Sequence, residues 1–218
     1  ALKQGDDSLP LKIERVQLIY KTKGLQEAIG EIIKLNNHYP DHPTLLASLA
    51  EFLYEDGRKD EAMKVAQKAL RCLETDAQNG DLEERARVHL ILGRLAHQAG
   101  QLDQSLHHLN ESIRMLPDKI DAYLELGNVL TERRQLTQAL NVFQQAINKA
   151  PNNPQAYFQA GLVLKQLKDY IEAENMLRQA ANLAPNDLVI QRNLGAVVAL
   201  NLVHNRPSRL STPIGKSL

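Results

Sequence analysis

The sequence predicts an all-α fold of the α-solenoid class, in which antiparallel helix pairs stack in a row. Three observations support this prediction. Apolar residues recur at helical spacing along most of the chain, prolines end successive segments at a fixed interval, and small residues recur at fixed positions within each segment. Aromatic residues make up only 4% of the chain and Trp is absent, which suits close helix packing better than sheets.

The clearest helix pair is predicted in residues 121–151. Its first helix has an apolar face at i, i+3, i+4 and i+7 spacing, formed by Tyr123, Leu126, Gly127 and Leu130. Its second helix repeats that spacing with Ala139, Leu140, Phe143, Ala146 and Ile147. Pro151 ends the pair, because its ring disfavours helical geometry at the preceding residue and it has no N–H to donate.

The prolines that end helix pairs give the length of the repeat. Pro40, Pro117, Pro151 and Pro185 are separated by 77, 34 and 34 residues, and 77 is 34 + 34 + 9. One unit therefore lacks its proline, and nine extra residues lie nearby. This spacing predicts units at 9–42, 43–76, 86–119, 120–153 and 154–187, with an insertion at 77–85 and an unpaired helix at 188–204.

Small residues occupy the positions where helices are expected to cross. In the first helix of each unit this column contains Val16, Ala50, Gly93, Gly127, Gly161 and Gly195. Matching columns of the second helices contain mostly Ala and Ser, and large apolar residues lie between them. A small side chain lets two helix axes approach closely, so these columns predict one packing arrangement repeated along the chain.

The chain resembles the tetratricopeptide-repeat family over residues 9–204. The best-matching stretches are AYLELGNVL followed by QALNVFQQAINKAP, and AYFQAGLVL followed by EAENMLRQAANLAP, and a helix–turn–helix unit of 34 residues is the period of that family. The resemblance implies a right-handed superhelix whose first helices line a concave groove. It also implies a non-catalytic role in binding a protein or peptide partner.

The ends and the insertion depart from the repeat. Residues 1–8 are expected to be an N-terminal extension, and residues 205–218 a flexible tail, because they contain Pro207, Pro213 and Gly215 without helical periodicity. In the insertion, Asn79-Gly80 indicates a turn and Asp81 can cap a helix that starts early, at Leu82. The insertion is interpreted as a tolerated loop, with a partner-contacting protrusion as the alternative.

Composition argues against several partner classes. Lys and Arg (26) balance Asp and Glu (26), so no broad basic surface is expected for nucleic acid or an anionic membrane. No apolar run approaches the roughly 18 residues that a membrane span needs. The single cysteine, Cys72, leaves no disulfide framework, which is compatible with an intracellular, cytoplasmic location.

The sequence contains no catalytic motif, and no enzyme activity, cofactor or metal is predicted. Gly-rich phosphate loops, HExxH, CxxC and GxSxG are all absent. His38 and His42 are four residues apart, but Pro40 between them breaks the helix that would direct both at one metal. His107 and His108 lie about 100° apart on a helix, so they cannot share a face and are expected to take part in surface or interhelix packing.

The first helices of the units are expected to line the groove implied by the resemblance. Its predicted lining mixes amide, charged and apolar side chains, which suits an extended or helical peptide. The predicted groove residues are Arg87, Arg94, His97, Leu124, Glu125, Asn128, Phe158, Gln159, Lys165, Arg192 and Asn193. Phe158 is the most distinctive apolar candidate. The clamp for a C-terminal carboxylate and the asparagine ladder, both known in parts of this family, are not matched.

The leading hypothesis is therefore a protein–protein interaction scaffold that binds a peptide segment of a partner in this groove. Two alternatives remain. The chain can be the repeat region of a larger enzyme or regulator, such as a transferase or kinase, or it can be a homo-oligomeric assembly factor. The unpaired helix motivates the last alternative, because Val197, Val198, Leu200 and Val203 give it more apolar surface than one neighbour covers.

Overall fold

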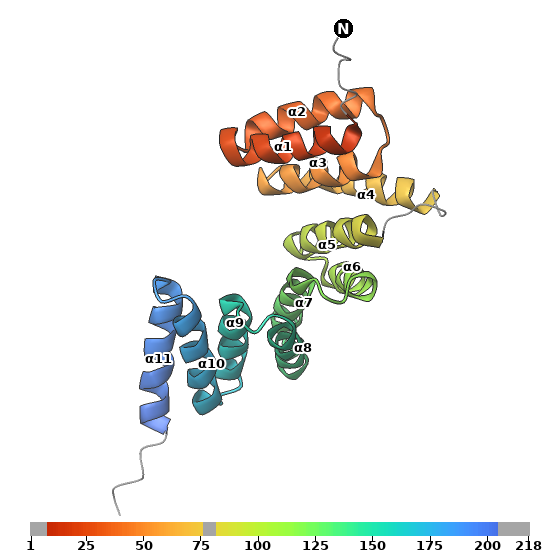
Figure 1. Cartoon of the computed structure of the whole chain (residues 1–218). Coiled ribbons are helices and arrows are strands. Elements are labelled where there is room, and N and C mark those ends of the chain that lie inside the picture. Colours follow the sequence, from red (N-terminus) through yellow and green to blue (C-terminus); the bar gives the residue numbers. More distant parts are fainter. Residues whose placement is uncertain (1–7, 76–81, 205–218) are drawn as a thin grey trace, which may run out of the picture. The chain divides into compact units, whose positions relative to one another are not determined.

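The structure is a computed structural model that describes residues 8–75 and 82–204. These residues form eleven α-helices and no strand (Figure 1), which confirms the predicted all-α class. The helices are α1 (Leu9–Lys23), α2 (Leu25–His38), α3 (Pro43–Glu55), α4 (Lys59–Thr75), α5 (Leu82–Gln98), α6 (Leu102–Met115), α7 (Ile120–Glu132), α8 (Leu136–Lys149), α9 (Pro154–Gln166), α10 (Tyr170–Leu183) and α11 (Leu188–His204).

The chain divides into two compact units, residues 1–129 and 130–218, and the division falls within α7. In the first unit α1 packs on α2, α3 on α4 and α5 on α6, and each pair contacts the next through α2–α3 and α4–α5. In the second unit α9 packs on α10, with α8 and α11 on either side. The helices of these pairs therefore pack mainly on their sequence neighbours, as in a solenoid.

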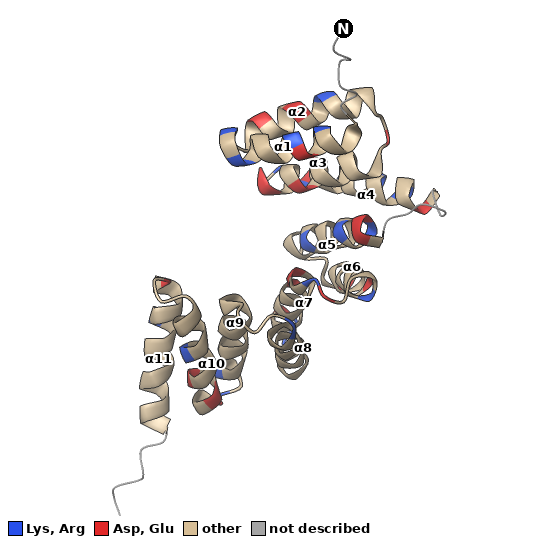
Figure 2. Ribbon diagram, in the orientation of Figure 1, with Lys and Arg blue, Asp and Glu red and all other residues tan. Residues whose placement is uncertain are grey.

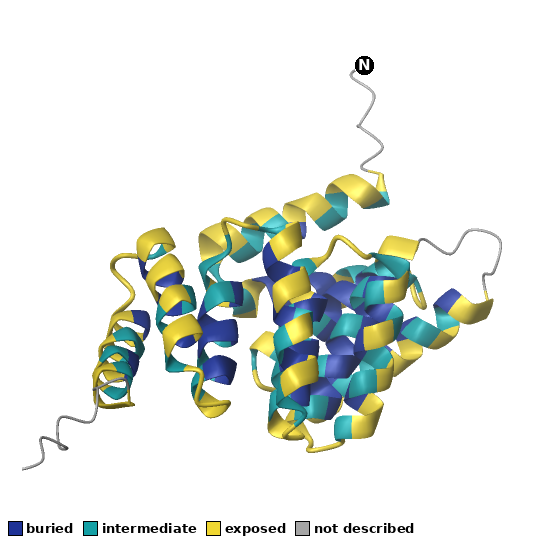
Figure 3. Ribbon diagram, turned by 90° about the horizontal axis from the view of Figure 1, so that it is seen from below, coloured by how far each residue is buried: buried dark blue, intermediate teal, exposed yellow. Residues whose placement is uncertain are grey.

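Burial follows the faces on which neighbouring helices meet (Figure 3). In the first unit a continuous core extends from Val16 of α1 to Leu95 of α5. In the second unit the core includes Phe158, Leu177 and Val197. No helix among the described residues is long and apolar enough to cross a membrane.

The glycine column creates close helix crossings within two of the pairs. A Cβ built on Gly93 would lie 2.7 Å from Cγ of Leu109, and one on Gly161 would lie 2.8 Å from Cγ of Leu177. Real Cβ atoms almost never approach other atoms this closely. At these two positions the second helix of the pair therefore occupies the space that a larger residue would need.

Serine replaces alanine in the small columns of α6, and each hydroxyl finds a backbone acceptor. Ser105 Oγ donates to the Gly93 carbonyl oxygen at 2.8 Å, and Ser112 Oγ donates to the Ala86 carbonyl oxygen at 2.8 Å. Both serines are buried. The two hydrogen bonds satisfy hydroxyls that would otherwise destabilise the α5–α6 interface.

The turn between the two helices of a unit requires a left-handed residue. Gly57 and Gly100 take this position with φ of 79° and 72°, whereas Arg134 and Lys168 take the equivalent position with φ of 62° and 65°. A residue with a Cβ is strained in this region and glycine is not. The turn therefore keeps its geometry even where the sequence does not supply glycine.

This strain predicts opposite effects for two substitutions. Gly100→Ala is expected to lower the free energy of unfolding by about 1 kcal/mol, because alanine is strained at positive φ, and Lys168→Gly is expected to raise it by about 0.5 kcal/mol. Urea denaturation followed by circular dichroism measures both. The prediction is wrong if Gly100→Ala leaves the stability unchanged.

The segments that depart from the repeat are only partly described. α5 begins at Leu82, so residues 82–85 of the expected insertion belong to this helix. The rest of the insertion, the first seven residues and the expected tail at 205–218 lie outside the described residues.

Candidate functional site

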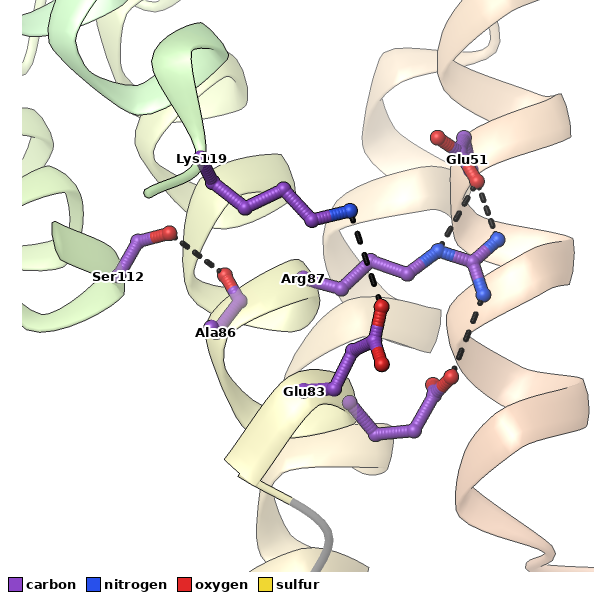
Figure 4. Close-up of polar contacts among 7 residues, drawn as sticks. Glu51, Glu83, Ala86, Arg87, Ser112 and Lys119 are labelled. Carbon is purple, nitrogen blue, oxygen red and sulfur yellow. Dashed lines mark hydrogen bonds and ion pairs between the residues drawn. The ribbon is translucent and has the colours of Figure 1, made fainter. Parts of the chain in front are cut away.

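The first unit contains six of the predicted groove residues, and Arg87 lies at the centre of one of their networks. Its guanidinium donates to Glu51 of α3, with Nε 3.1 Å from Oε2, and contacts Glu84 of its own helix at 3.5 Å (Figure 4). Burial alone would lower the pKa of Arg87, but the carboxylates of Glu51 and Glu84 raise it above the usual value. Arg87 therefore stays charged and links two successive first helices.

A second network links α5 to α7. Arg94 Nε donates to Glu125 Oε1 at 3.0 Å, and His97 Nδ1 lies 4.0 Å from the other oxygen of the same carboxylate. Tyr54 of α3 lies close to this pair. Burial and the charge of Glu125 raise the pKa of the Tyr54 hydroxyl, while Arg94 opposes the shift, so the hydroxyl stays neutral, and it accepts a 2.8 Å hydrogen bond from Gln98 Nε2.

A small cavity lies between these two networks. Its volume is about 110 Å³, and because a water occupies roughly 30 Å³ of liquid, it can admit one short side chain. The lining brings together both predicted arginines with other residues of α5 and with residues of α3, α6, the α6–α7 connection and the start of α7: Glu51, Ala86, Arg87, Leu90, Arg94, Ser112, Leu116, Lys119 and Asp121. Figure 4 shows Arg87, Lys119 and Ser112 around this region, with Lys119 Nζ 3.8 Å from Glu83 Oε1.

The charges of this surface largely neutralise one another. Arg87 and Arg94 each contact a carboxylate on a neighbouring first helix, and their side chains are only 24% exposed. The surface therefore presents paired charges and not a cationic patch. Paired charges of this kind offer hydrogen-bond donors and acceptors of both signs and little net charge.

Two further predicted residues of the first unit lie on α7 beside Glu125. Leu124 and Asn128 are half-buried, and they are four residues apart, so they lie one above the other on the helix. They add an apolar and an amide side chain to the surface that Arg94 and Glu125 occupy.

The second unit positions its predicted groove residues differently. Phe158 is only 8% exposed and packs into the core with Leu164 and Leu177, so its ring has little surface to offer a ligand. Asn193 is half-buried, and its amide donates to the Val189 carbonyl oxygen of its own helix at 2.8 Å. The remaining predicted residues are half-buried or exposed: Gln159, Lys165 and Arg192.

The residues suggested for self-association do not form one surface. Val197 is fully buried in the core of the second unit, so it is not available to a partner. Val198 and Leu200 are half-buried, and Val203 is 67% exposed.

Sequence reasoning missed two features of the first unit. Glu84 was not included in the groove, because it falls in the segment expected to be an insertion. A second cavity of about 560 Å³ lies among α4, the end of α5 and the start of α6. Four exposed glutamines line it, Gln67, Gln98, Gln101 and Gln104, but they occupy different columns of the repeat and so formed no pattern.

Histidines form a cluster outside the predicted groove. His89 of α5 is buried, and its Nδ1 lies 3.0 Å from Nδ1 of His108 on α6. His107 lies beside His108, with 5.3 Å between ring centroids. Among residues 8–75 and 82–204, no group of three His, Cys, Asp or Glu side chains is placed to hold a metal ion.

The chain matches three models of repeat families. A model described as TPR repeat matches residues 127–168, and two models described as tetratricopeptide repeat match residues 154–187 and 26–79. No curated protein matches the sequence.

Several solved structures share the fold. YrrB, described as a TPR protein with an unusual peptide-binding site, has 19% identity and a TM-score of 0.62 over 86% of this chain and 91% of YrrB. TTC0263, a thermophilic TPR protein of Thermus thermophilus, has 18% identity and a TM-score of 0.64 over 86% of this chain and 97% of its own. The Cut9-Hcn1 hetero-tetramer of APC/C has 19% identity and a TM-score of 0.74 over 92% of this chain and 38% of the matched chain.

At these identities the likeness shows the fold alone. The family matches, the 34-residue period and the stacked helix pairs agree with one another. The chain therefore belongs to the tetratricopeptide-repeat family.

Proposed function

We propose that this chain is a non-catalytic interaction scaffold that binds a peptide segment of a partner protein on the first-helix surface of its first unit. The binding site in this proposal is the Arg87–Glu51 and Arg94–Glu125 surface with its 110 Å³ cavity. We also propose an intracellular, cytoplasmic location, on the basis of the single free cysteine.

One observation supports this site above the others. Two ion pairs join three successive first helices there, Arg87–Glu51 between α5 and α3 and Arg94–Glu125 between α5 and α7, beside one cavity. A peptide lying across these helices would meet donors and acceptors of both signs within a short span. Such a lining favours an extended chain, whose backbone offers both N–H and C=O groups and whose side chains can fill the cavity.

The comparisons are consistent with this function. YrrB is described as having a peptide-binding site, and the Cut9-Hcn1 structure is a hetero-tetramer. The family as a whole typically binds other proteins. Phe158 contributes to the stability of the second unit in this proposal, since it is buried.

Reversing the charge of Arg94 tests the proposal. Peptides selected from a displayed library of random dodecamers on the full wild-type chain are expected to bind the Arg94→Glu variant at least roughly tenfold more weakly. The reason is that Arg94→Glu replaces an ion pair with two like charges at the edge of the cavity. Fluorescence anisotropy of labelled peptides measures the affinities.

Two variants act as controls for this measurement. Arg178→Glu makes the same charge change beside Glu174 on α10 and is expected to leave binding unchanged. The double variant Arg94→Glu/Glu125→Arg restores the pairing with its direction reversed, so it should recover stability without recovering the original affinity. Selected peptides that bind wild type and Arg94→Glu equally would place the binding site elsewhere.

A further inference from the structure

Helix α11 has one covered face and one open face. Ile190 and Val197 are 2% and 0% exposed and pack against α10. On the opposite side Leu188 and Leu202 are 82% and 65% exposed. Figure 2 shows few charged residues on this helix, and Arg192 is its only Lys, Arg, Asp or Glu. Apolar side chains on an open face with a single charged residue indicate an interaction surface.

The open face includes the glycine of the close-crossing column. Gly195 aligns with Gly161 and Gly93, at intervals of 34 and 102 residues. At Gly161 and Gly93 a leucine of the second helix lies so close that a Cβ would clash, whereas a Cβ at Gly195 meets no described atom within 4 Å. Gly195 is thus the crossing point of a helix pair whose second helix is not among the described residues.

The residues around Gly195 complete the same surface. Leu188, Gly195 and Leu202 are seven residues apart and so lie along one side of the helix. Leu164, which flanks Gly161 in α9, is 6% exposed because α10 covers it. Its equivalent in α11, Val198, remains half-buried.

The second helices of this chain show which sequence fits such a face. On their buried side, a small residue is followed four positions later by a large apolar residue and seven positions later by another small residue. The pattern occurs as Ser105–Leu109–Ser112, Ala139–Phe143–Ala146 and Ala173–Leu177–Ala180, and all nine side chains are at most 1% exposed. The large residue enters the space above the glycine, and the small residues allow the close approach.

We propose that the open face of α11 binds an amphipathic helix of a partner protein that carries this pattern. In that helix Ala or Ser is followed four positions later by Leu, Ile or Phe, and seven positions later by a second Ala or Ser. The partner's large apolar residue would sit over Gly195, between Leu188 and Leu202. Arg192 is exposed three residues before Gly195 on the same side. An acidic residue at the edge of the partner helix would therefore face Arg192.

A second copy of the chain does not supply this helix. The pattern occurs in the second helices described above, and each of those occurrences is already buried inside its own unit. Neither α11 itself nor residues 205–218 contain it. Residues 1–218 therefore contain no copy of the pattern that is free to cover this face. We assign the face to a helix of a different protein, and this site is separate from the peptide surface proposed for the first unit.

A peptide copy of α10 can serve as the probe. Residues 169–185 include the Asp169 cap, whose Oδ1 accepts from the Glu172 N–H, and the complete pattern around Leu177. The labelled peptide is added to the full chain and its binding is followed by fluorescence anisotropy. Saturable binding is expected, and Gly195→Leu is expected to weaken it at least roughly tenfold by filling the crossing point.

Three comparisons make the result specific. Ala196→Leu adds the same side chain about 100° around the same helix and should leave binding unchanged. A probe with Leu177→Glu should not bind. The Arg94→Glu variant should bind the probe normally, so failure here and failure of the function proposed above are distinguishable.

The proposal is overturned if binding of the probe does not saturate at chain concentrations up to about 1 mM. It is also overturned if the Gly195→Leu variant binds the probe as well as the wild type does. Sedimentation of the wild-type chain without the probe measures whether the chain dimerises. If the chain dimerises and Gly195→Leu abolishes the dimer, the occupant is a second copy and the choice of a different protein is wrong.

Discussion

Gly161→Leu is expected to lower the free energy of unfolding by about 3 kcal/mol. A Cβ at this position would lie 2.8 Å from Cγ of Leu177 and 3.3 Å from the Ala173 carbonyl oxygen. Leu177 is fully buried in the core of the second unit, so it has no solvent-facing space into which to turn. The new side chain must therefore push α10 away from α9, and urea denaturation followed by circular dichroism measures the cost.

Gly195→Leu is the matched control, because it makes the same change in the same column. No described atom lies within 4 Å of a Cβ there, and leucine favours the helix over glycine by up to about 0.8 kcal/mol. The stability of this variant should equal or exceed that of the wild type. Equal losses in both variants would show that the column does not set the crossing distance.

A double variant separates overpacking from other effects. Leu177→Ala alone is expected to cost about 3 kcal/mol, since it removes most of a buried side chain. Combined with Gly161→Leu, it frees the space that the added side chain needs, so the two losses should not add. A coupling free energy of at least about 1 kcal/mol in favour of the double variant is expected.

The sequence predicted the packing columns well, for a physical reason. The close crossings at Gly93 and Gly161 depend on the spacing of residues within one helix pair. Because the same spacing recurs in the other helix pairs, the sequence shows it several times. Val16 and Ala50, the first members of the column, are also buried. Repetition averages out the uncertainty that a single helix pair would carry.

The groove was predicted less completely, because it depends on how successive pairs turn relative to one another. Position in the column could place Arg94 and Glu125 on one surface, but it could not show that they pair at 3.0 Å. Phe158 was expected to be a peptide anchor, and the structure buries it instead. A side chain at the border between the core face and the groove face of a helix can be buried or exposed to a ligand. The packing of the neighbouring helix determines which of the two occurs.

The histidine pair shows a signal that the sequence did contain. His89 lies in the column of Tyr123 and Tyr157, where a large ring packs toward the second helix. That alignment predicts an inward side chain, but its contact with His108, nineteen residues away, requires the register of the α5–α6 pair. His107 and His108 alone gave no indication of a buried partner.

The stability of the first unit is expected to fall by about 2 kcal/mol as the pH drops from 7.5 to 4.5. Burial, followed by the charge of His108, lowers the pKa of His89 from 6.5 to about 4, while Glu111 opposes the shift. A lowered folded pKa means that the unfolded chain binds protons first, so this stability is present above about pH 6.5 and is lost on acidification. One pKa unit corresponds to about 1.4 kcal/mol of stability. The expected loss is smaller than the full shift would give, because movement of the α5–α6 pair should relieve part of that shift.

The groups around the pair define the experiment. Burial and His107 also lower the pKa of His108, and His107, Glu111 and Arg114 are the other charged groups that act on His89. The neutral pair needs one Nδ1–H and one bare Nδ1, so two protonated rings would face donor to donor. Urea denaturation at several pH values measures the loss.

His89→Phe provides the decisive comparison, because it keeps a ring in the core and removes the titrating group. Its stability should change much less between pH 6.5 and 4.5 than that of the wild type, whereas His38→Gln, at an exposed position, should follow the wild type. The lowered pKa of Glu111, which results mainly from its hydrogen bond to Arg114, also destabilises the fold in acid, but that loss begins near the usual carboxylate range below about pH 4.5. An identical pH profile in His89→Phe and wild type would assign the loss to carboxylates and remove the histidine pair from the explanation.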